Sequence, residues 1–146
     1  MNKTLKTILI IVFIGIIAGV ITGIYLYNKP ARDIAGAKPD YNLTAAELIN
    51  QYITDQKSSD AKYLDKVILV NGKIAEITNN GNTGMTIVLE SQMQGINCAV
   101  DTLYFKENRS ILLSLSAGNE VKIKGVCSGF DDTFQCVNLD KCTLLD

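Results

Sequence analysis

The chain contains no histidine, so it lacks the side chain that most often acts as a general base. A G-x-S-x-G nucleophile elbow and a glycine-rich phosphate-binding loop are also absent from the sequence. The four cysteines form no C-x-x-C pair, which argues against structural zinc and against redox catalysis. These absences predict a non-enzymatic protein with no cofactor and no metal site.

Basic residues are scarce in the C-terminal three quarters of the chain. Over Tyr41–Asp146 there are 9 Lys and Arg against 13 Asp and Glu, a net charge of −4, whereas the whole chain has a net charge of −1. A nucleic-acid-binding protein normally carries a basic surface. The charge distribution therefore disfavours nucleic acid as a partner and favours a protein, a peptide or a glycan.

Formal charge is missing altogether from Thr7–Asn28, a run of 22 mostly aliphatic residues. A helix of that length reaches about 33 Å, enough to cross a hydrocarbon core of about 30 Å. The run is longer than the apolar region of a signal peptide and ends without a small-residue cleavage pattern. Residues 1–28 are therefore predicted to be an uncleaved transmembrane signal anchor that contacts the membrane through residues 5–27. A cleaved signal is the alternative.

The charges that flank this run indicate the orientation of the anchor. Lys3 and Lys6 precede it together with the α-amino group, whereas Lys29 and Arg32 follow it and are partly balanced by Asp33. The positive-inside bias favours an inside amino terminus by a small margin. Four cysteines without metal-type spacing also fit an oxidising compartment. The sequence predicts a single-pass protein of the cell membrane whose C-terminal domain is extracytoplasmic.

Small residues recur at every fourth position of the predicted anchor. Gly15, Gly19 and Gly23 would lie on one face of a helix. Such a stripe lets two membrane helices approach closely. A homodimer through these three glycines is therefore possible on the sequence pattern.

A linker and a leading helix are predicted after the anchor. Both prolines of the chain fall in residues 29–40, which predicts a linker and leaves residues 41–146 as the folded domain. Thr44 and Glu47 have the spacing of a capping box, in which each side chain binds a free amide of the other. Apolar residues then recur at helical spacing, which predicts a helix over residues 45–56.

Five β-strands with a helix between the third and the fourth are predicted in the rest of the domain. The strands are read from period-two alternation over residues 66–74, 85–90, 96–101, 121–127 and 133–145, and the helix lies within 101–117 and ends at Gly118. This order, β-β-β-α-β-β, is that of the OB-fold barrel, and a flat five-stranded sheet is the alternative. Gly72 and Gly125 stand inside strands, which favours the barrel because closure needs sharp bends. The fold class is thus mainly β.

Short motifs along the domain resemble one bacterial family. They are Lys62-Tyr63, Lys66, Val70-x-Gly72-x-Ile74, Cys98, Leu115-x-x-Gly118-x-x-Val121-x-Ile123-x-Gly125-x-Cys127-x-Gly129 and Leu139-x-x-Cys142. In these residues the chain resembles the tRNA-anticodon-binding-like OB-fold family, whose members are often lipoproteins. The resemblance covers residues 41–146 and implies an OB fold and a place in the bacterial envelope or periplasm. It implies no particular substrate. This chain departs from many members because no lipidation cysteine follows the apolar run.

The cysteines are candidates for structural disulfides. If Asp131 and Asp132 are the two loop residues of a hairpin, Cys127 and Cys136 face each other as a non-hydrogen-bonded pair. The Cα atoms of such a pair are about 4.5 Å apart. That separation allows a disulfide.

The same register has a consequence that conflicts with a simple barrel. It points Val137 and Leu139 away from the face that carries Cys127, and a bulge that corrected this would remove the pairing. Cys127–Cys136 together with Cys98–Cys142 is the leading one of three possible connectivities. Buried free thiols that pack as small hydrophobic groups are the alternative.

The ligand-binding surface is expected on strands two and three and on the last hairpin loop. OB folds that bind single strands carry aromatic and basic residues on these strands. Residues 85–90 and 96–101 contain neither. Phe130 and Phe134 flank the hairpin turn and are the candidate ligand-binding residues. The predicted function is a non-enzymatic binding module of unknown ligand. The alternatives are a single-strand oligonucleotide binder and a structural subunit of a membrane assembly.

Overall fold

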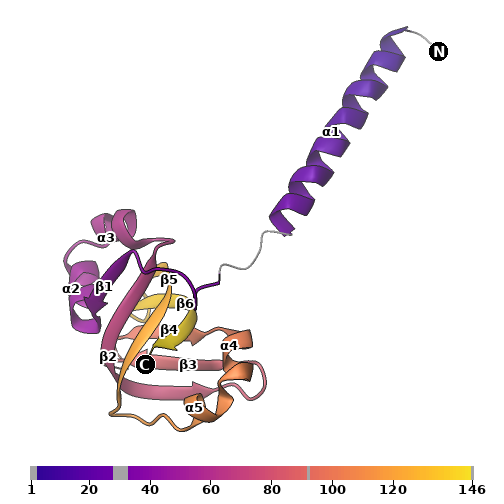
Figure 1. The fold of residues 1–146 in the computed structure, drawn as a ribbon. Coiled ribbons are helices and arrows are strands. Elements are labelled where there is room, and N and C mark those ends of the chain that lie inside the picture. The colour runs from indigo at the N-terminus through magenta and orange to yellow at the C-terminus, as the bar shows by residue number, and fades with distance from the viewer. Residues whose placement is uncertain (1–2, 28–32, 92, 146) are drawn as a thin grey trace. The chain divides into compact units, whose positions relative to one another are not determined.

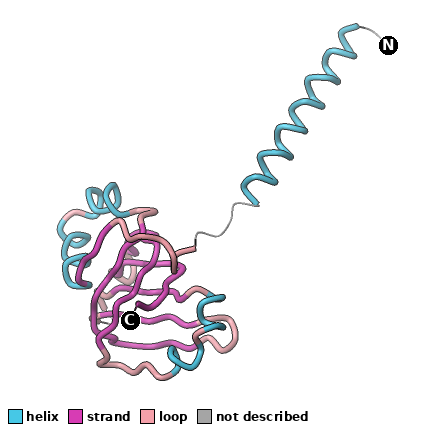
Figure 2. Tube along the Cα trace, viewed as in Figure 1, coloured by secondary structure: helices cyan, strands magenta, loops and turns pink. Residues whose placement is uncertain are grey.

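The computed structural model describes residues 3–27, 33–91 and 93–145, which fall into two compact units divided after Arg32. The first unit is the helix α1, Lys3–Tyr27. Its segment Leu5–Ile24 has a mean hydropathy of 2.8 and is exposed along its length, and by length and composition it could cross a membrane. The second unit, from Asp33 onward, contains all the β-structure that is described (Figure 1, Figure 2).

The second unit begins with a short strand and two helices. The strand β1, Tyr41–Thr44, was not expected from the sequence, and it pairs in parallel with the next strand. Helix α2, Ala45–Thr54, begins at the predicted capping box, where Thr44 Oγ1 accepts from the Glu47 amide at 3.2 Å and Glu47 Oε2 accepts from the Thr44 amide at 2.8 Å. The N-terminus of this helix is therefore fixed by its own sequence. Helix α3, Gln56–Tyr63, follows.

Five further strands close into a barrel, as the sequence predicts. They are β2 Val67–Asn79, β3 Met85–Leu89, β4 Ile96–Val100, β5 Glu120–Asp131 and β6 Cys136–Leu145. The order around the sheet is β1-β2-β3-β4-β6-β5, and a β2–β5 pairing completes the closure. The β4–β6 pair is parallel, while the other four pairs of the barrel are antiparallel.

The helix between β4 and β5 is broken into two pieces. Helix α4 spans Thr102–Glu107 and α5 spans Arg109–Leu113, with Asn108 between them. Asp101 caps α4 by accepting hydrogen bonds from the amides of two residues of its first turn. In Figure 1 these helices lie at one end of the barrel, and α2 and α3 lie at the other.

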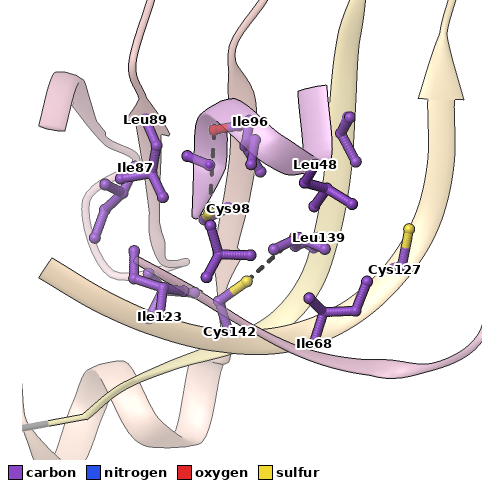
Figure 3. Close-up of a cluster of buried hydrophobic side chains, with 14 of the residues drawn as sticks. Leu48, Ile68, Ile87, Leu89, Ile96, Cys98, Ile123, Cys127, Leu139 and Cys142 are labelled. Atoms are coloured by element: carbon purple, nitrogen blue, oxygen red, sulfur yellow. Dashed lines mark hydrogen bonds between the residues drawn. The ribbon is translucent and has the colours of Figure 1, made fainter. Parts of the chain in front are cut away.

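Alternation along the strands produces the core of the barrel (Figure 3). In β3 the side chains of Met85, Ile87 and Leu89 are buried, and the residues between them are partly exposed. Leu48 from α2 and Leu112 from α5 join the same cluster. Burial of a large aliphatic side chain contributes about 1.5–3 kcal/mol. The two groups of helices therefore help to seal the barrel.

The two mid-strand glycines stand at close approaches. A Cβ atom on Gly125 would lie 2.6 Å from the Cys142 sulfur, and one on Gly72 would lie 2.8 Å from the Ala45 Cβ. Gly125 is also opposite Ile68 in the β2–β5 pairing that closes the sheet. The expectation that these glycines serve barrel closure is consistent with this geometry.

The register expected for the last hairpin is wrong. Asp131 pairs with Cys136, so the loop has four residues, 132–135, in place of the two expected. A bulge between Cys127 and Gly129 then sets Cys127 opposite Leu139. Cys127 and Cys136 therefore do not face each other. The expected register points Leu139 away from the face that carries Cys127. The bulge places both side chains on the same face, where they are buried in the core.

Residues 33–40 fall within the linker expected from the sequence, but they pack on the barrel. Ile34 is 3% exposed. The buried Lys124 Nζ donates to the carbonyl oxygens of Ala35 and Ala37 at 2.7 and 2.8 Å. The Asp40 carboxylate accepts a hydrogen bond from the amide of Val67 at the start of β2. The rest of the expected linker, residues 29–32, lies outside the described part of the chain.

Candidate ligand-binding site

A cleft of about 270 Å³ opens between the end of α2 and the β3–β4 and β5–β6 turns. We call it the loop cleft, and its described lining residues are Tyr52, Ile53, Gln56, Gln94, Phe130, Asp132 and Gln135. The helix and the two turns are distant in sequence. They meet because β4 and β6 are parallel neighbours, so that the turns before them lie at the same end of the barrel.

Two glutamines join the turns on either side of the cleft. The side-chain amide of Gln94 donates to Gln135 Oε1 at 3.1 Å. Both residues have positive φ, 64° for Gln94 and 51° for Gln135. This left-handed conformation costs a residue with a Cβ roughly 1–2 kcal/mol, and glycine and asparagine are the residues that usually adopt it. Gln94 and Gln135 therefore stand at two positions where the backbone conformation alone would favour glycine or asparagine.

An aromatic pair forms the inner wall of the cleft. The rings of Tyr52 and Phe130 stack with centroids 5.7 Å apart and planes 9° apart. The Tyr52 hydroxyl lies 3.3 Å from the Cys127 sulfur, and burial, followed by this contact, raises the pKa of Tyr52. Its phenol is therefore neutral at physiological pH. Phe130, a candidate from the sequence, lines the cleft, whereas Phe134 is 69% exposed on the neighbouring loop and is not among the described lining residues.

The chemistry of the cleft is polar and almost uncharged. Among its described lining residues, Asp132 is the only acidic side chain, and there is no lysine or arginine. Gln56, Gln94 and Gln135 each carry an amide that can donate and accept hydrogen bonds. Such a site can orient a neutral ligand that has its own hydroxyl or amide groups.

The outer face of β3 and β4 is also polar and carries few charges. Asn97 on β4 donates from its amide to the Cys136 sulfur at 3.1 Å and to Asn138 Oδ1 at 3.4 Å. Val88 and Ala99 are partly exposed on the two strands. This face therefore offers amides and small apolar groups to a ligand.

The four cysteines are buried free thiols in the structure. Burial is the main cause that raises the pKa of Cys127, Cys136 and Cys142, and for Cys142 the neighbouring Cys98 thiol raises it further. Figure 3 shows Cys98 and Cys142 in the core, each directed at a main-chain carbonyl. Thiols with raised pKa values are poor nucleophiles at neutral pH.

A second cleft, of about 330 Å³, lies at the elbow between α2 and α3. Its polar groups already bind one another. The Tyr63 hydroxyl donates to Gln51 Oε1 at 2.6 Å, and Lys62 Nζ lies 3.4 Å from the same oxygen. Because its central acceptor is occupied, this cleft is the weaker candidate.

The three glycines of the stripe on α1 have free space where a side chain would lie. A Cβ on Gly15, Gly19 or Gly23 would meet nothing within 4 Å. Homodimerisation through this stripe stays a prediction.

Of the residues that line the cleft, the sequence singled out Phe130 as a candidate but not the glutamines or Tyr52. Gln94 carries the one usable signal, because it stands directly before Gly95 in a turn. Tyr52 looks like an ordinary apolar position of an amphipathic helix. Its place beside Phe130 depends on tertiary packing.

The parallel β4–β6 pair and the helices between β4 and β5 define a five-stranded barrel of the OB type. The family model described as tRNA_anti-like matches residues 1–141, and the chain belongs to this family. No curated protein matches the chain.

Three solved structures align with the chain, and the first of them has the same fold. A "putative nucleic acid-binding lipoprotein" from Klebsiella pneumoniae subsp. pneumoniae MGH 78578 aligns with a TM-score of 0.55 and 15% identity over 81% of this chain and 100% of that one. The Entamoeba histolytica asparaginyl-tRNA synthetase aligns with a TM-score of 0.43 and 14% identity over 59% of this chain and 22% of that one. The S. pombe Stn1–Ten1 complex gives a TM-score of 0.40 and 19% identity over 54% and 57%. At 15% identity the likeness to the Klebsiella protein concerns the fold alone.

Proposed function

We propose that this protein is a single-pass, membrane-anchored binding module whose barrel lies outside the cytoplasm of a bacterial cell. It binds a ligand other than nucleic acid through the loop cleft and the adjoining face of β3 and β4, and it performs no catalysis. The observation that carries the proposal is the amide-lined cleft, with its stacked aromatic wall and no lysine or arginine among its described lining residues, at the end of the barrel.

The apolar helix supports anchoring in the membrane, and the charges that flank it support a position of the barrel outside the cytoplasm. The segment Leu5–Ile24 matches the length of a bilayer core. Lys3 and Lys6 before it favour an inside amino terminus. The test is a fusion after Asp146 to a phosphatase that folds only when exported. High phosphatase activity is expected, whereas high activity of a matched cytoplasmic reporter at the same position would contradict the orientation.

Two observations support a binding role over catalysis. The chain has no histidine. Three of its four cysteines have pKa values raised mainly by burial, which disfavours the thiolate. A positioned base and an activated nucleophile are what most hydrolytic and transfer reactions require.

The charge of the surface supports a ligand other than nucleic acid. Residues 41–146 have a net charge of −4, and Asp132 lies in the cleft itself. Phosphate groups would be repelled there, and binding of single strands relies on a basic groove. The nucleic-acid alternative is therefore supported by the fold alone, which many functions share.

Site-specific photo-crosslinking in the native membrane tests the binding surface. A photoreactive phenylalanine analogue replaces Phe134, which is 69% exposed beside the cleft. The matched control replaces Leu103, which is 67% exposed on α4 at the other end of the barrel. A discrete adduct is expected from position 134 and none from position 103. Digestion with protease, glycosidase or nuclease then classifies the adduct. A nuclease-sensitive adduct, or the same result at both positions, would overturn the proposal.

A further inference from the structure

We infer that the loop cleft takes a single neutral sugar unit of an extracellular glycan. The inference rests on the proposed function and gives a chemical class to its ligand. It is carried by three features of the cleft: its amides, its apolar wall and its lack of cationic groups.

The amides supply the hydrogen bonds that a sugar needs. A pyranose ring presents several hydroxyls, each a donor and an acceptor. Gln56, Gln94 and Gln135 present groups of both kinds, and Asp132 adds a strong acceptor. The bond between Gln94 and Gln135 uses one donor and one acceptor, so each amide keeps further hydrogen-bonding capacity for a ligand.

The walls supply an apolar surface of matching size. Phe130, backed by Tyr52, is partly exposed, and Ile53 is 52% exposed on the helix side. The C–H face of a sugar can pack on such side chains while its hydroxyls face the glutamines. A volume of about 270 Å³ is slightly below the usual range for drug-sized ligands, which suits one ring better than an extended chain.

The charges of the cleft exclude anionic ligands. Asp132 is unopposed by lysine or arginine among the described lining residues, so a phosphate or a carboxylate would meet repulsion. A neutral ligand with many hydroxyls meets no such penalty.

Five of the described non-glycine residues have positive φ, and the two that are glutamines both line the loop cleft. Gln94 and Gln135 both have positive φ at positions where glycine would remove the strain. Residues held in such conformations cluster at binding sites. If these side chains served only to join the turns, replacing either glutamine with glycine would relieve the strain and would cost only the bond between them.

The test uses the full chain in nanodiscs with ¹⁵N-labelled glutamine and records the side-chain amide signals by NMR. The probes are glucose, mannose, N-acetylglucosamine and their linear oligomers at millimolar concentration. At least one probe is expected to shift the signals of Gln94, Gln135 and Gln56. The signal of Gln51, in the cleft between α2 and α3, serves as the internal control and stays in place.

Two glycine variants separate a binding role from a structural one. Gln135→Gly is expected to weaken binding about tenfold, the effect of one or two hydrogen bonds, while the thermal midpoint stays equal or rises. Lys141→Gly is the matched control, because Lys141 is exposed and also has a positive φ of 52°. It relieves the same strain and is expected to leave binding unchanged.

The inference is overturned if no sugar shifts the glutamine signals, or if Gln135→Gly binds as tightly as the parent. If sugars fail while position 134 crosslinks to a protein or a peptide, the sugar is wrong and the proposed function stands. If single-stranded DNA shifts the same signals, both are wrong.

Discussion

The buried ammonium of Lys124 donates a hydrogen bond to the carbonyl oxygen of Ala35 at 2.7 Å. Strand β5 thereby holds the segment at the start of the second unit. A second bond from the same nitrogen reaches the carbonyl of Ala37, and Lys124 is only 4% exposed. The segment from Asp33 to Lys38 is thus part of the folded unit.

The first prediction concerns this attachment. Lys124→Met in a soluble fragment of residues 33–146 removes two hydrogen bonds from a charged donor, and the free energy of unfolding in urea should fall by about 2 kcal/mol. In a shorter fragment, residues 39–146, the same lysine has lost both carbonyl partners. The substitution should then change the unfolding free energy by less than about 0.5 kcal/mol. Equal losses in the two fragments would show that the lysine acts independently of the segment.

The second prediction concerns the close approach at Gly125. Gly125→Ala places a methyl group 2.6 Å from the Cys142 sulfur and 3.1 Å from the Asp140 carbonyl oxygen, which is main chain and yields little. Overpacking of this kind costs about 1–3 kcal/mol, measured by urea unfolding. Gly36→Ala is the control, because its nearest neighbour is the flexible carboxylate of Asp33. An equal or smaller loss at Gly125 would contradict the proposed packing.

The third prediction concerns the cysteines under oxidation. The Cys98 thiol lies beside that of Cys142 in the core and raises the pKa of Cys142, whereas Cys127 faces Leu139. When local opening admits diamide to the core, the reagent should therefore join Cys98 to Cys142, with two thiols losing two protons and two electrons to the diazene. Peptide mass spectrometry without reduction identifies the product. Recovery of a Cys127–Cys136 peptide as the main product would show that the register of the last hairpin is not that of the structure.

The elements that the sequence predicted are those with a local cause. The capping box of Thr44 and Glu47 specifies where α2 begins, and alternation in residues 85–89 and 96–100 specifies two strands and their buried faces. These signals need no information from distant parts of the chain. The strand Tyr41–Thr44 escaped notice because four residues are too few for a period to be read.

The features that escaped prediction depend on register. The difference between a two-residue and a four-residue loop at Asp131, together with a bulge at Gly129, decides which residue faces Cys127. A sequence that allows several turn types cannot decide this alone. The loop cleft has the same origin, because Gln94 and Gln135 meet only when β4 and β6 pair in parallel.

The last prediction concerns alkaline pH. Burial raises the pKa of the Cys127 and Cys142 thiols above the ordinary value of 9.0, and for Cys142 the Cys98 thiol adds to this. The thiol pKa values are higher in the folded state than in the unfolded state. Below the unfolded pKa the thiols are protonated in both states, and the folded state has its full stability. As the pH rises above that value, the unfolded state loses these protons first, and the free energy of unfolding falls. The free energy of unfolding should therefore decline from about pH 9 upward, by at most about 1.4 kcal/mol per pH unit for each thiol.

Urea unfolding of the fragment 33–146 between about pH 8 and pH 10 measures this decline. The range stops at the ordinary pKa of the Tyr52 phenol, 10.0. Burial also raises the pKa of this phenol, so at higher pH its ionisation in the unfolded state would lower the free energy of unfolding further. Cys142→Ala removes one titrating thiol, so its stability should fall less steeply over the same range. A slope equal to that of the parent would mean that Cys142 does not hold its proton in the folded state, and that the sulfur is not enclosed in the core as the structure has it.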